Sequence, residues 1–123
     1  MAKPPLIYLA LSDSVAERVE EELQPLKARM VRVSDGEELI RLCREVPPEV
    51  VILEKEIPKL DGYAAVLLLK SSPRTAKIPV VGVCKCLSSE EFEKARDAGC
   101  DDYVCYPFNK GELKEVVEKI LRG

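Results

Sequence analysis

Short apolar runs and longer amphipathic stretches alternate strictly along this chain, and no other feature constrains its fold as strongly. Each run is of strand length and almost continuously apolar, which is typical of a parallel strand covered on both faces. In the stretches between the runs, apolar residues recur at helical spacing. The pattern predicts strands at residues 6–11, 30–33, 50–54, 79–83 and 102–105, and helices at residues 14–26, 34–46, 63–70, 88–99 and 109–121.

Five strand–helix units in series predict an α/β fold, because right-handed crossovers place helices on both faces of a parallel sheet. The common solution for five units is flavodoxin-like, a doubly wound (βα)5 parallel sheet with strand order 2-1-3-4-5. A dinucleotide-binding fold is the rival, but Ser12-Asp13-Ser14 follows the first run where that fold places glycines, and no P-loop occurs. Ligands of such sheets bind outside the carboxyl ends of the strands, so the functional residues are expected there.

The domain organisation is simple. The chain has 123 residues, a common size for one domain, and neither a linker nor an internal repeat divides it. We therefore expect a single domain over residues 1–123. Met1 favours a natural start, and we expect the domain to stand alone, without an attached DNA-binding or enzymatic segment.

Charge and residue usage exclude several classes of function. Lys and Arg number 19 against 22 Asp and Glu, so the net charge of −3 provides no basic field for a nucleic acid. No apolar run approaches the roughly 18 residues of a membrane span, and the N-terminus lacks a secretory signal. We therefore expect a cytoplasmic protein without a membrane or nucleic-acid partner. The chain has no histidine, which is the commonest general base, so we expect no enzymatic activity.

Three segments carry a resemblance to a known family. They are IPKLDGY at 57–63, PRTAKIPV at 73–80 and AGCDDYVCYPF at 98–108. In this order and at these offsets they resemble the receiver domain of bacterial two-component response regulators, the family of the chemotaxis switch protein. The resemblance extends from about Leu6 to Leu121. It implies the same flavodoxin-like fold and a role in two-component signal transduction.

The resemblance also assigns the chemical positions of a receiver domain. The phospho-accepting Asp of the family falls on Glu54, and its pair of acidic residues after the first strand falls on Ser12 and Asp13. The switch Thr or Ser falls on Cys84, and the lysine before Pro-Phe falls on Tyr106. Four of these five positions are altered, and Asp13 alone keeps the family's residue type.

The alterations predict that the chain does not run the phosphorylation cycle. Phosphoryl transfer depends on positioning and on charge neutralisation by Mg²⁺ and a cation. Glu54 is longer than Asp by about 1.5 Å, and a misplacement of about 1 Å can cost roughly 100-fold in rate. Ser12 removes an oxygen ligand of Mg²⁺, and Tyr106 removes the cation. We therefore expect no cofactor and no bound Mg²⁺.

Three alternatives at this site remain open. The domain could still be phosphorylated weakly, on Glu54 or elsewhere. Glu54 could instead imitate the phosphorylated aspartate. Asp13 and Glu54 could also face each other and bind a divalent ion, which is the weakest of the three because two ligands are few. Lys55 and Lys85 are expected to point away from this pocket if the strands run straight. We expect Tyr106 to fill the space of the lysine stem, with a cis bond to Pro107 as the resemblance implies.

The resemblance implies an output surface on the fourth helix, fifth strand and fifth helix. Tyr103 matches the aromatic residue that couples phosphorylation to this surface. The residues that match the surface are Phe92, Lys94, Tyr103, Phe108 and Lys110. We therefore expect a protein partner in a signalling complex to bind there, in a pseudo-receiver that acts through protein–protein interaction.

The five cysteines suggest an alternative from another class. Cys84 and Cys86 point to the same side of an extended strand end, and Cys105 ends the neighbouring strand. Two of these thiols could form a redox-sensitive disulfide or bind a soft metal ion. No C-x-x-C occurs, although zinc sites made of cysteines usually have that spacing. Cys43 and Cys100 are expected to be core or turn residues.

Overall fold

The computed structural model describes residues 3–85 and 89–123. Over these residues the chain forms five strands, five α-helices and one short 3₁₀ turn. The strands are β1 (Leu6–Ala10), β2 (Arg29–Arg32), β3 (Val50–Glu54), β4 (Val80–Cys84) and β5 (Asp102–Cys105). The helices are α1 (Asp13–Leu23), α2 (Gly36–Glu45), α3 (Gly62–Ser71), α4 (Ser89–Ala98) and α5 (Glu112–Arg122), with the turn η1 (Gln24–Leu26) after α1.

The sheet has the order β2-β1-β3-β4-β5, and all neighbouring strands are parallel. The predicted flavodoxin-like α/β fold is therefore confirmed. Its register pairs Glu54 with Val83 and Cys84 with Cys105. The last residues of β3, β4 and β5 thus meet at one edge of the sheet, as expected for parallel strands.

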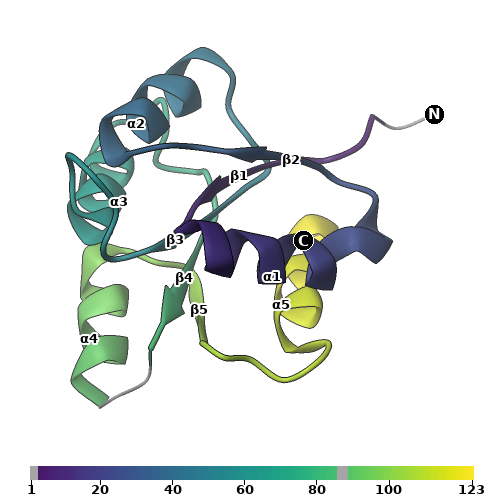
Figure 1. The fold of residues 1–123 in the computed structure, drawn as a ribbon. Coiled ribbons are helices and arrows are strands. Elements are labelled where there is room, and N and C mark those ends of the chain that lie inside the picture. The colour runs from purple at the N-terminus through teal and green to yellow at the C-terminus, as the bar shows by residue number, and fades with distance from the viewer. Residues whose placement is uncertain (1–2, 86–88) are drawn as a thin grey trace.

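Two helical layers cover the sheet. Figure 1 shows α1 and α5 on one face and α2, α3 and α4 on the other. Successive residues of β1 alternate between the two faces: Ile7 and Leu9 belong to the core beneath α1 and α5, whereas Tyr8 and Ala10 belong to the core beneath the other three helices. The buried side chains on both faces are almost all apolar among the described residues, as expected for a sheet that helices cover on both sides.

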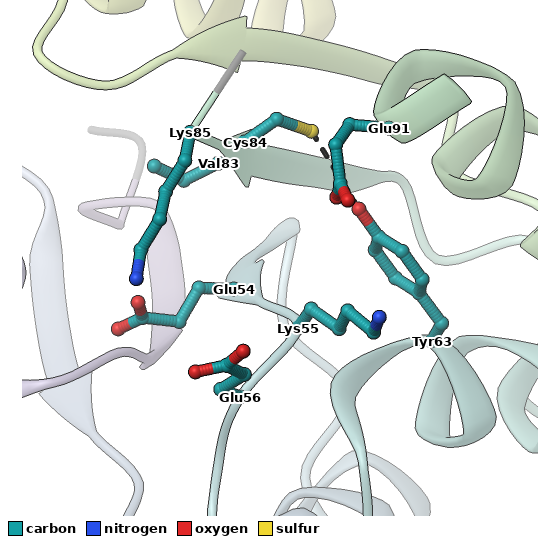
Figure 2. A pocket seen from close by; sticks show the side chains of 8 residues that line it. All are labelled: Glu54, Lys55, Glu56, Tyr63, Val83, Cys84, Lys85 and Glu91. Atoms are coloured by element: carbon teal, nitrogen blue, oxygen red, sulfur yellow. Dashed lines mark hydrogen bonds between the residues drawn. The ribbon is translucent and has the colours of Figure 1, made fainter. Parts of the chain in front are cut away.

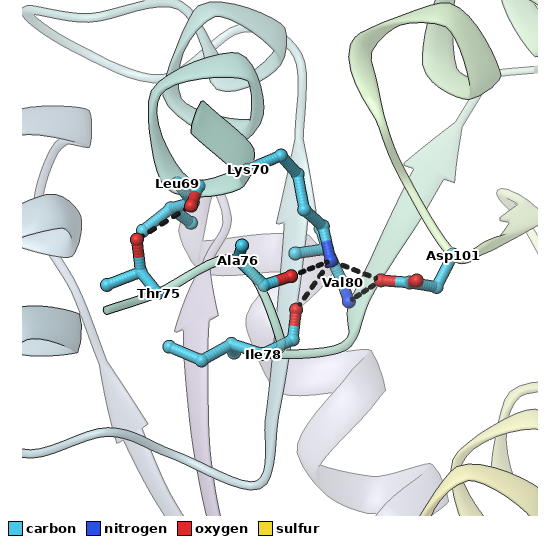
Figure 3. A network of polar contacts seen from close by, with 7 residues as sticks. All are labelled: Leu69, Lys70, Thr75, Ala76, Ile78, Val80 and Asp101. Atoms are coloured by element: carbon cyan, nitrogen blue, oxygen red, sulfur yellow. Dashed lines mark hydrogen bonds and ion pairs between the residues drawn. The ribbon is translucent and has the colours of Figure 1, made fainter. Parts of the chain in front are cut away.

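A polar network ties the helical layer to the sheet at the amino ends of β4 and β5 (Figure 3). The ammonium of Lys70, on α3, donates to the carbonyl oxygens of Ala76 and Ile78 at 3.2 and 2.8 Å and to Asp101 at 2.9 Å. The same oxygen of Asp101 accepts from the backbone N–H of Val80 at 2.8 Å. These contacts join two of the three sequence motifs at the edge opposite the strands' carboxyl ends.

No helix within residues 3–85 and 89–123 is both long enough and apolar enough to cross a lipid bilayer.

Candidate functional site

A pocket of about 170 Å³ opens at the carboxyl ends of β3 and β4 (Figure 2). Side chains from β3, β4 and the segments that follow them line it, together with one side chain each from α3 and α4. These residues are Glu54, Lys55, Glu56, Tyr63, Val83, Cys84, Lys85 and Glu91. The structure therefore places the candidate site at the edge of the sheet where the fold predicts it.

Glu54 is the last residue of β3, and its half-buried carboxylate contacts the backbone at the end of β1. The backbone N–H of Ser12 donates a hydrogen bond to Oε1 of Glu54. Ser12 is the N-cap residue of α1, and its side chain makes no cap hydrogen bond in that position. One oxygen of the Glu54 carboxylate is thus engaged by the second residue after the neighbouring strand.

The side chain of Asp13 lines neither of the two pockets that contain Glu54, so the structure does not bring these two acids together as a shared cation site. The side chain of Asp13 is 98% exposed, and its carboxylate lies 3.6 Å from the guanidinium of Arg32. Arg32 also donates two hydrogen bonds to Glu20, at 3.0 and 2.7 Å. These hydrogen bonds hold the pKa of Glu20 below its ordinary value. Arg32, which ends the edge strand β2, therefore pairs with two acids of α1, Asp13 and Glu20.

Lys85 lines the pocket, contrary to the expectation that it points away. It lies one residue beyond β4 and lines both this pocket and an adjoining one that contains Glu54 and Tyr106. Figure 2 shows its ammonium directed toward the carboxylate of Glu54. The expectation was wrong because side chains alternate between faces only along a straight strand, and β4 ends at Cys84.

Lys55 lines the pocket as well, and here too the expectation was wrong. Its ammonium lies 6.0 Å from the centroid of the Tyr63 ring. Figure 2 shows it extended toward Tyr63 rather than toward Glu54. The two lysines therefore lie on different sides of the pocket, Lys55 near Tyr63 and Lys85 near Glu54.

Cys84, at the predicted switch position, is buried and contacts α3. The hydroxyl of Tyr63 and Sγ of Cys84 form a hydrogen bond of 3.7 Å. Burial raises the pKa of the Tyr63 hydroxyl and of the Cys84 thiol above their ordinary values. The thiol at this position therefore carries little thiolate character, and it links the end of β4 to α3.

Tyr106 follows β5 and lines the adjoining pocket with Ser12, Ser14, Glu54 and Lys85, among others. Its ring packs edge-on against the ring of Phe108, with centroids 5.8 Å apart. The peptide bond between Tyr106 and Pro107 is cis, as predicted. The phenol therefore lies beside Glu54, where the resemblance places a lysine.

The loop between β3 and α3 shapes one wall of the site. Asp61 caps α3 by accepting from the backbone N–H groups of Tyr63 and Ala64, at 2.9 and 3.3 Å. Gly62 lies so close to β3 that an added Cβ would be 2.2 Å from the carbonyl oxygen of Glu54. The Asp-Gly pair of the first motif is therefore required for the loop to begin α3 directly against Glu54.

The predicted output surface differs in one residue from the expectation. Phe92 of α4 and Tyr103 of β5 pack together with ring centroids 4.6 Å apart, and both are partly exposed. Lys94 and Lys110 are exposed. Phe108 is only 4% exposed and carries the guanidinium of Arg18 5.1 Å from its ring centroid, so it belongs to the core beneath α1 and α5.

One observation supports part of the cysteine alternative, because Cys105 is disulfide-bonded. Cys86 lies outside the described residues, so its predicted role is not assessed. Cys43 and Cys100 are buried as expected, and burial raises the pKa of each thiol to about 12. Cys84 and Cys105 are register partners on neighbouring strands.

The side chains at this edge do not fit a Mg²⁺ ion, which needs several oxygen ligands in octahedral geometry. Among the described residues, no group of three or more His, Cys, Asp or Glu is arranged to hold a metal ion. Asp13 is beside Arg32, and Glu54 accepts a hydrogen bond from the backbone. The expectation that Mg²⁺ is disfavoured is consistent with this donor set.

Sequence reasoning missed Lys85 as a pocket residue, along with Glu56 and Glu91. Glu91 lies in the first turn of α4 and lines the pocket from there. No sequence pattern marks such a contact, because it depends on how α4 packs against the sheet. The position of Lys85 directly after a strand was a usable signal.

Comparisons with known proteins agree with the geometry. The family model described as "Response regulator receiver domain" matches residues 12–118. The "Probable transcriptional regulator ycf27" of Guillardia theta is 30% identical over 109 residues, which cover 89% of this chain and 42% of that protein. The "Gliding motility regulatory protein" of Myxococcus xanthus is 32% identical over 110 residues, covering 88% of this chain and 14% of that protein. This chain thus spans less than half the length of either relative.

A solved structure supports the same assignment. The crystal structure of a response regulator from Chloroflexus aurantiacus superimposes with a TM-score of 0.92 at 26% identity, and it covers 98% of this chain and 100% of that one. Glu54, Tyr103 and Tyr106 all lie within the range that the family model matches, residues 12–118. This chain belongs to the response regulator receiver domain family.

Proposed function

We propose that this receiver domain acts without phosphorylation, as a protein-interaction module in signal transduction. Receiver domains are signalling modules that bind protein partners, and they are typically not enzymes themselves. The finer proposal is that the pocket at Glu54 no longer accepts a phosphoryl group. The observation that carries it is the lining of the two pockets at Glu54, where Ser12, Cys84 and Tyr106 stand in place of the family's acid, hydroxyl and lysine.

The surroundings of Glu54 support the proposal. Phosphoryl transfer needs a metal ion, a cation and donors that are placed to stabilise the transferred group. The side chains at three of these positions, Ser12, Cys84 and Tyr106, carry no charge. The thiol of Cys84 is hydrogen-bonded to the hydroxyl of Tyr63. Asp13 is held beside Arg32. The loss of both ligands and donors argues against even slow turnover.

The output surface of this module is proposed to be fixed in one conformation. In this proposal the contact between Phe92 and Tyr103 keeps the β5 aromatic against α4, and the Tyr63–Cys84 contact keeps the end of β4 against α3. Neither contact involves Glu54. A partner would therefore recognise α4, β5 and α5 irrespective of any signal at the pocket. The partners and pathways of the relatives are not assigned to this chain. We propose that its partner is a protein and not a nucleic acid.

The proposed site residues divide into two groups. The pocket group is Glu54 at the former acceptor position, Ser12 and Asp13 at the acidic pair, and Tyr106 at the lysine position. The switch group is Cys84 and Tyr103. A single domain over residues 1–123 is proposed to be sufficient for partner binding.

The decisive experiment is incubation of the protein with Mg²⁺ and acetyl phosphate, followed by intact mass spectrometry. We expect no added phosphoryl group, and a phosphorylatable receiver domain treated in parallel provides the positive control. Stoichiometric uptake would contradict the proposal, and uptake abolished by Glu54→Gln would establish the weakly phosphorylated alternative instead.

A second experiment addresses the surface. Binding of a candidate signalling partner should weaken at least tenfold in Tyr103→Ala, because the variant removes the aromatic contact with Phe92. Glu21→Ala, exposed on α1 and so outside this surface, is the matched control. Equal affinities of the two variants would mean that the partner does not use this surface.

A further inference from the structure

Asp13 and Glu54, the two acids of the weakest alternative, each have a positively charged side chain of this chain nearby. Arg32 of β2 lies 3.6 Å from Asp13. Lys85 lines two adjoining pockets together with Glu54 and Glu56, and Figure 2 shows its ammonium directed toward Glu54. Both positive groups are distant in sequence from the acid that they lie near, so the sequence alone does not reveal this charge pairing.

We propose that Lys85 excludes divalent cations from the pocket around Glu54. The inference rests on the proposed function, since it gives a physical reason why this pocket would bind poorly the metal ion that phosphoryl transfer requires. Lys85 follows β4, whereas the family's lysine falls after β5, at the position of Tyr106. The residue acts on the specificity of the pocket and takes part in no reaction.

The electrostatic argument concerns the position of the charge. A divalent cation bound at Glu54 would share its pockets with the Lys85 side chain, whose ammonium is directed toward that carboxylate (Figure 2). At about 5 Å in a water-like dielectric, the repulsion between the two lowers affinity by about tenfold, and salt reduces this effect. Lys85 is exposed, so the water-like value is the appropriate one.

The other lysine of the pocket does not replace it. The Lys55 ammonium lies against the ring of Tyr63, on the side of the pocket away from Glu54. Without Lys85, the carboxylates of Glu54 and Glu56 would face the pocket with no ammonium directed at them. Carboxylate oxygens are the ligands that Mg²⁺ prefers. Removal of Lys85 should therefore create a weak site for a divalent cation.

The test is a Mg²⁺ titration of the full chain at low ionic strength, with no phosphoryl donor present. Chemical shifts of the backbone amides near residues 12 and 54 report binding, and Tb³⁺ luminescence sensitised by the tyrosines provides a second probe. We expect Lys85→Met and Lys85→Gln to bind Mg²⁺ at least about tenfold more tightly than the wild-type protein. Lys85→Arg, which keeps the charge, should match the wild type. Lys55→Met, which removes a charge on the other side of the pocket, should change affinity by less than about threefold.

Three results would overturn the inference. The first is an unchanged affinity in both neutral variants of Lys85. The second is an equal gain in Lys55→Met, since net charge alone would then explain the effect. The third is wild-type protein that binds Mg²⁺ as tightly as Lys85→Met. Phosphoryl uptake by the wild-type protein contradicts the proposed function, whereas an unchanged Mg²⁺ affinity in the Lys85 variants contradicts only this inference.

Discussion

The two edges of the sheet differ in how completely their polar groups are paired. At the amino edge, Lys70 donates to three oxygens, and Asp101 accepts from both Lys70 and the Val80 N–H (Figure 3). At the carboxyl edge, Glu54 accepts from the backbone of Ser12, and the side chain of Asp13 is 98% exposed. The polar contacts at the amino edge hold α3 to the starts of β4 and β5, whereas the carboxyl edge carries an open pocket.

This difference teaches which parts of the family's motifs serve the fold. Asp101 belongs to the third motif and joins α3, β4 and β5, so its replacement would disturb three elements. Residues 12, 84 and 106 lie around a pocket whose walls are built by other contacts. Their side chains can therefore change without loss of the architecture, and in our proposal they have changed together.

The largest expected effect is a gain of function at the carboxyl edge. A variant that combines Ser12→Asp, Glu54→Asp, Cys84→Thr, Tyr106→Lys and Lys85→Ala should pass from no phosphoryl uptake to measurable uptake. It restores the residue types that the family resemblance implies and removes the pocket's ammonium at Lys85. Intact mass after incubation with Mg²⁺ and acetyl phosphate measures the effect.

The matched control replaces position 54 by Asn in the same combined background, which should abolish uptake. A folded combined variant that takes up no phosphoryl group would show that the two edges differ by more than these five side chains. Circular dichroism establishes the folding of each variant.

The next effect is a loss of stability at the amino edge. Asp101→Ala should lower the free energy of unfolding by about 1–3 kcal/mol, because it leaves the Lys70 ammonium and the Val80 N–H without an acceptor they now share. Glu54→Ala removes one hydrogen bond at an open pocket and should cost about 0.5–1 kcal/mol. Urea unfolding measures both. A larger loss in Glu54→Ala than in Asp101→Ala would reverse the comparison.

A third effect of about 1 kcal/mol is expected between α1 and α5. Glu22 is only 8% exposed, and its carboxylate accepts from the backbone N–H of Gly111 at 2.6 Å. Gly111 is the N-cap residue of α5, and Glu22 of α1 accepts from its backbone N–H, the group that a glutamate at N3 satisfies in a capping box. Glu22→Ala should destabilise the protein and speed hydrogen exchange in the first turn of α5. Glu21→Ala, exposed on the same helix, should have almost no effect on either measurement.

The smallest effect depends on pH. Arg32 holds the pKa of Glu20 below its ordinary value through their hydrogen bonds. A carboxyl whose pKa is lowered by folding stabilises the protein above its unfolded-state pKa, and this contribution is lost as the pH falls through the folded-state pKa. The stability difference between wild type and Glu20→Gln should therefore be largest at neutral pH and shrink below about pH 4. The pair is partly exposed, so we expect less than about 1 kcal/mol. A difference that grows on acidification would contradict this assignment.

Much of the fold could be predicted from the sequence, because it depends on periodicity. Continuous apolar runs such as Val50 to Leu53 mark strands that are buried on both faces, and β3 confirms this one. Strand bounds shifted by one residue in places, as in β2, where the edge position weakens the apolar signal. The cis bond before Pro107 followed from the family resemblance.

The site was predicted less completely, because its contacts join distant segments. The residues after β1, β3 and β5 lie at one edge as expected, but their partners depend on side-chain directions. Arg32 reaches Asp13 from an edge strand, and Lys85 turns toward Glu54 once β4 has ended. The contact of Glu22 with Gly111 spans 89 positions of sequence and leaves no periodic trace.

The central claim is that the surface of α4, β5 and α5 does not respond to the pocket at Glu54. Backbone amide spectra of the ¹⁵N-labelled protein, recorded with and without Mg²⁺ and acetyl phosphate, test it most directly. Our account predicts that the amides around Phe92 and Tyr103 stay in place. Saturable shifts of those amides that disappear in Glu54→Gln would contradict it.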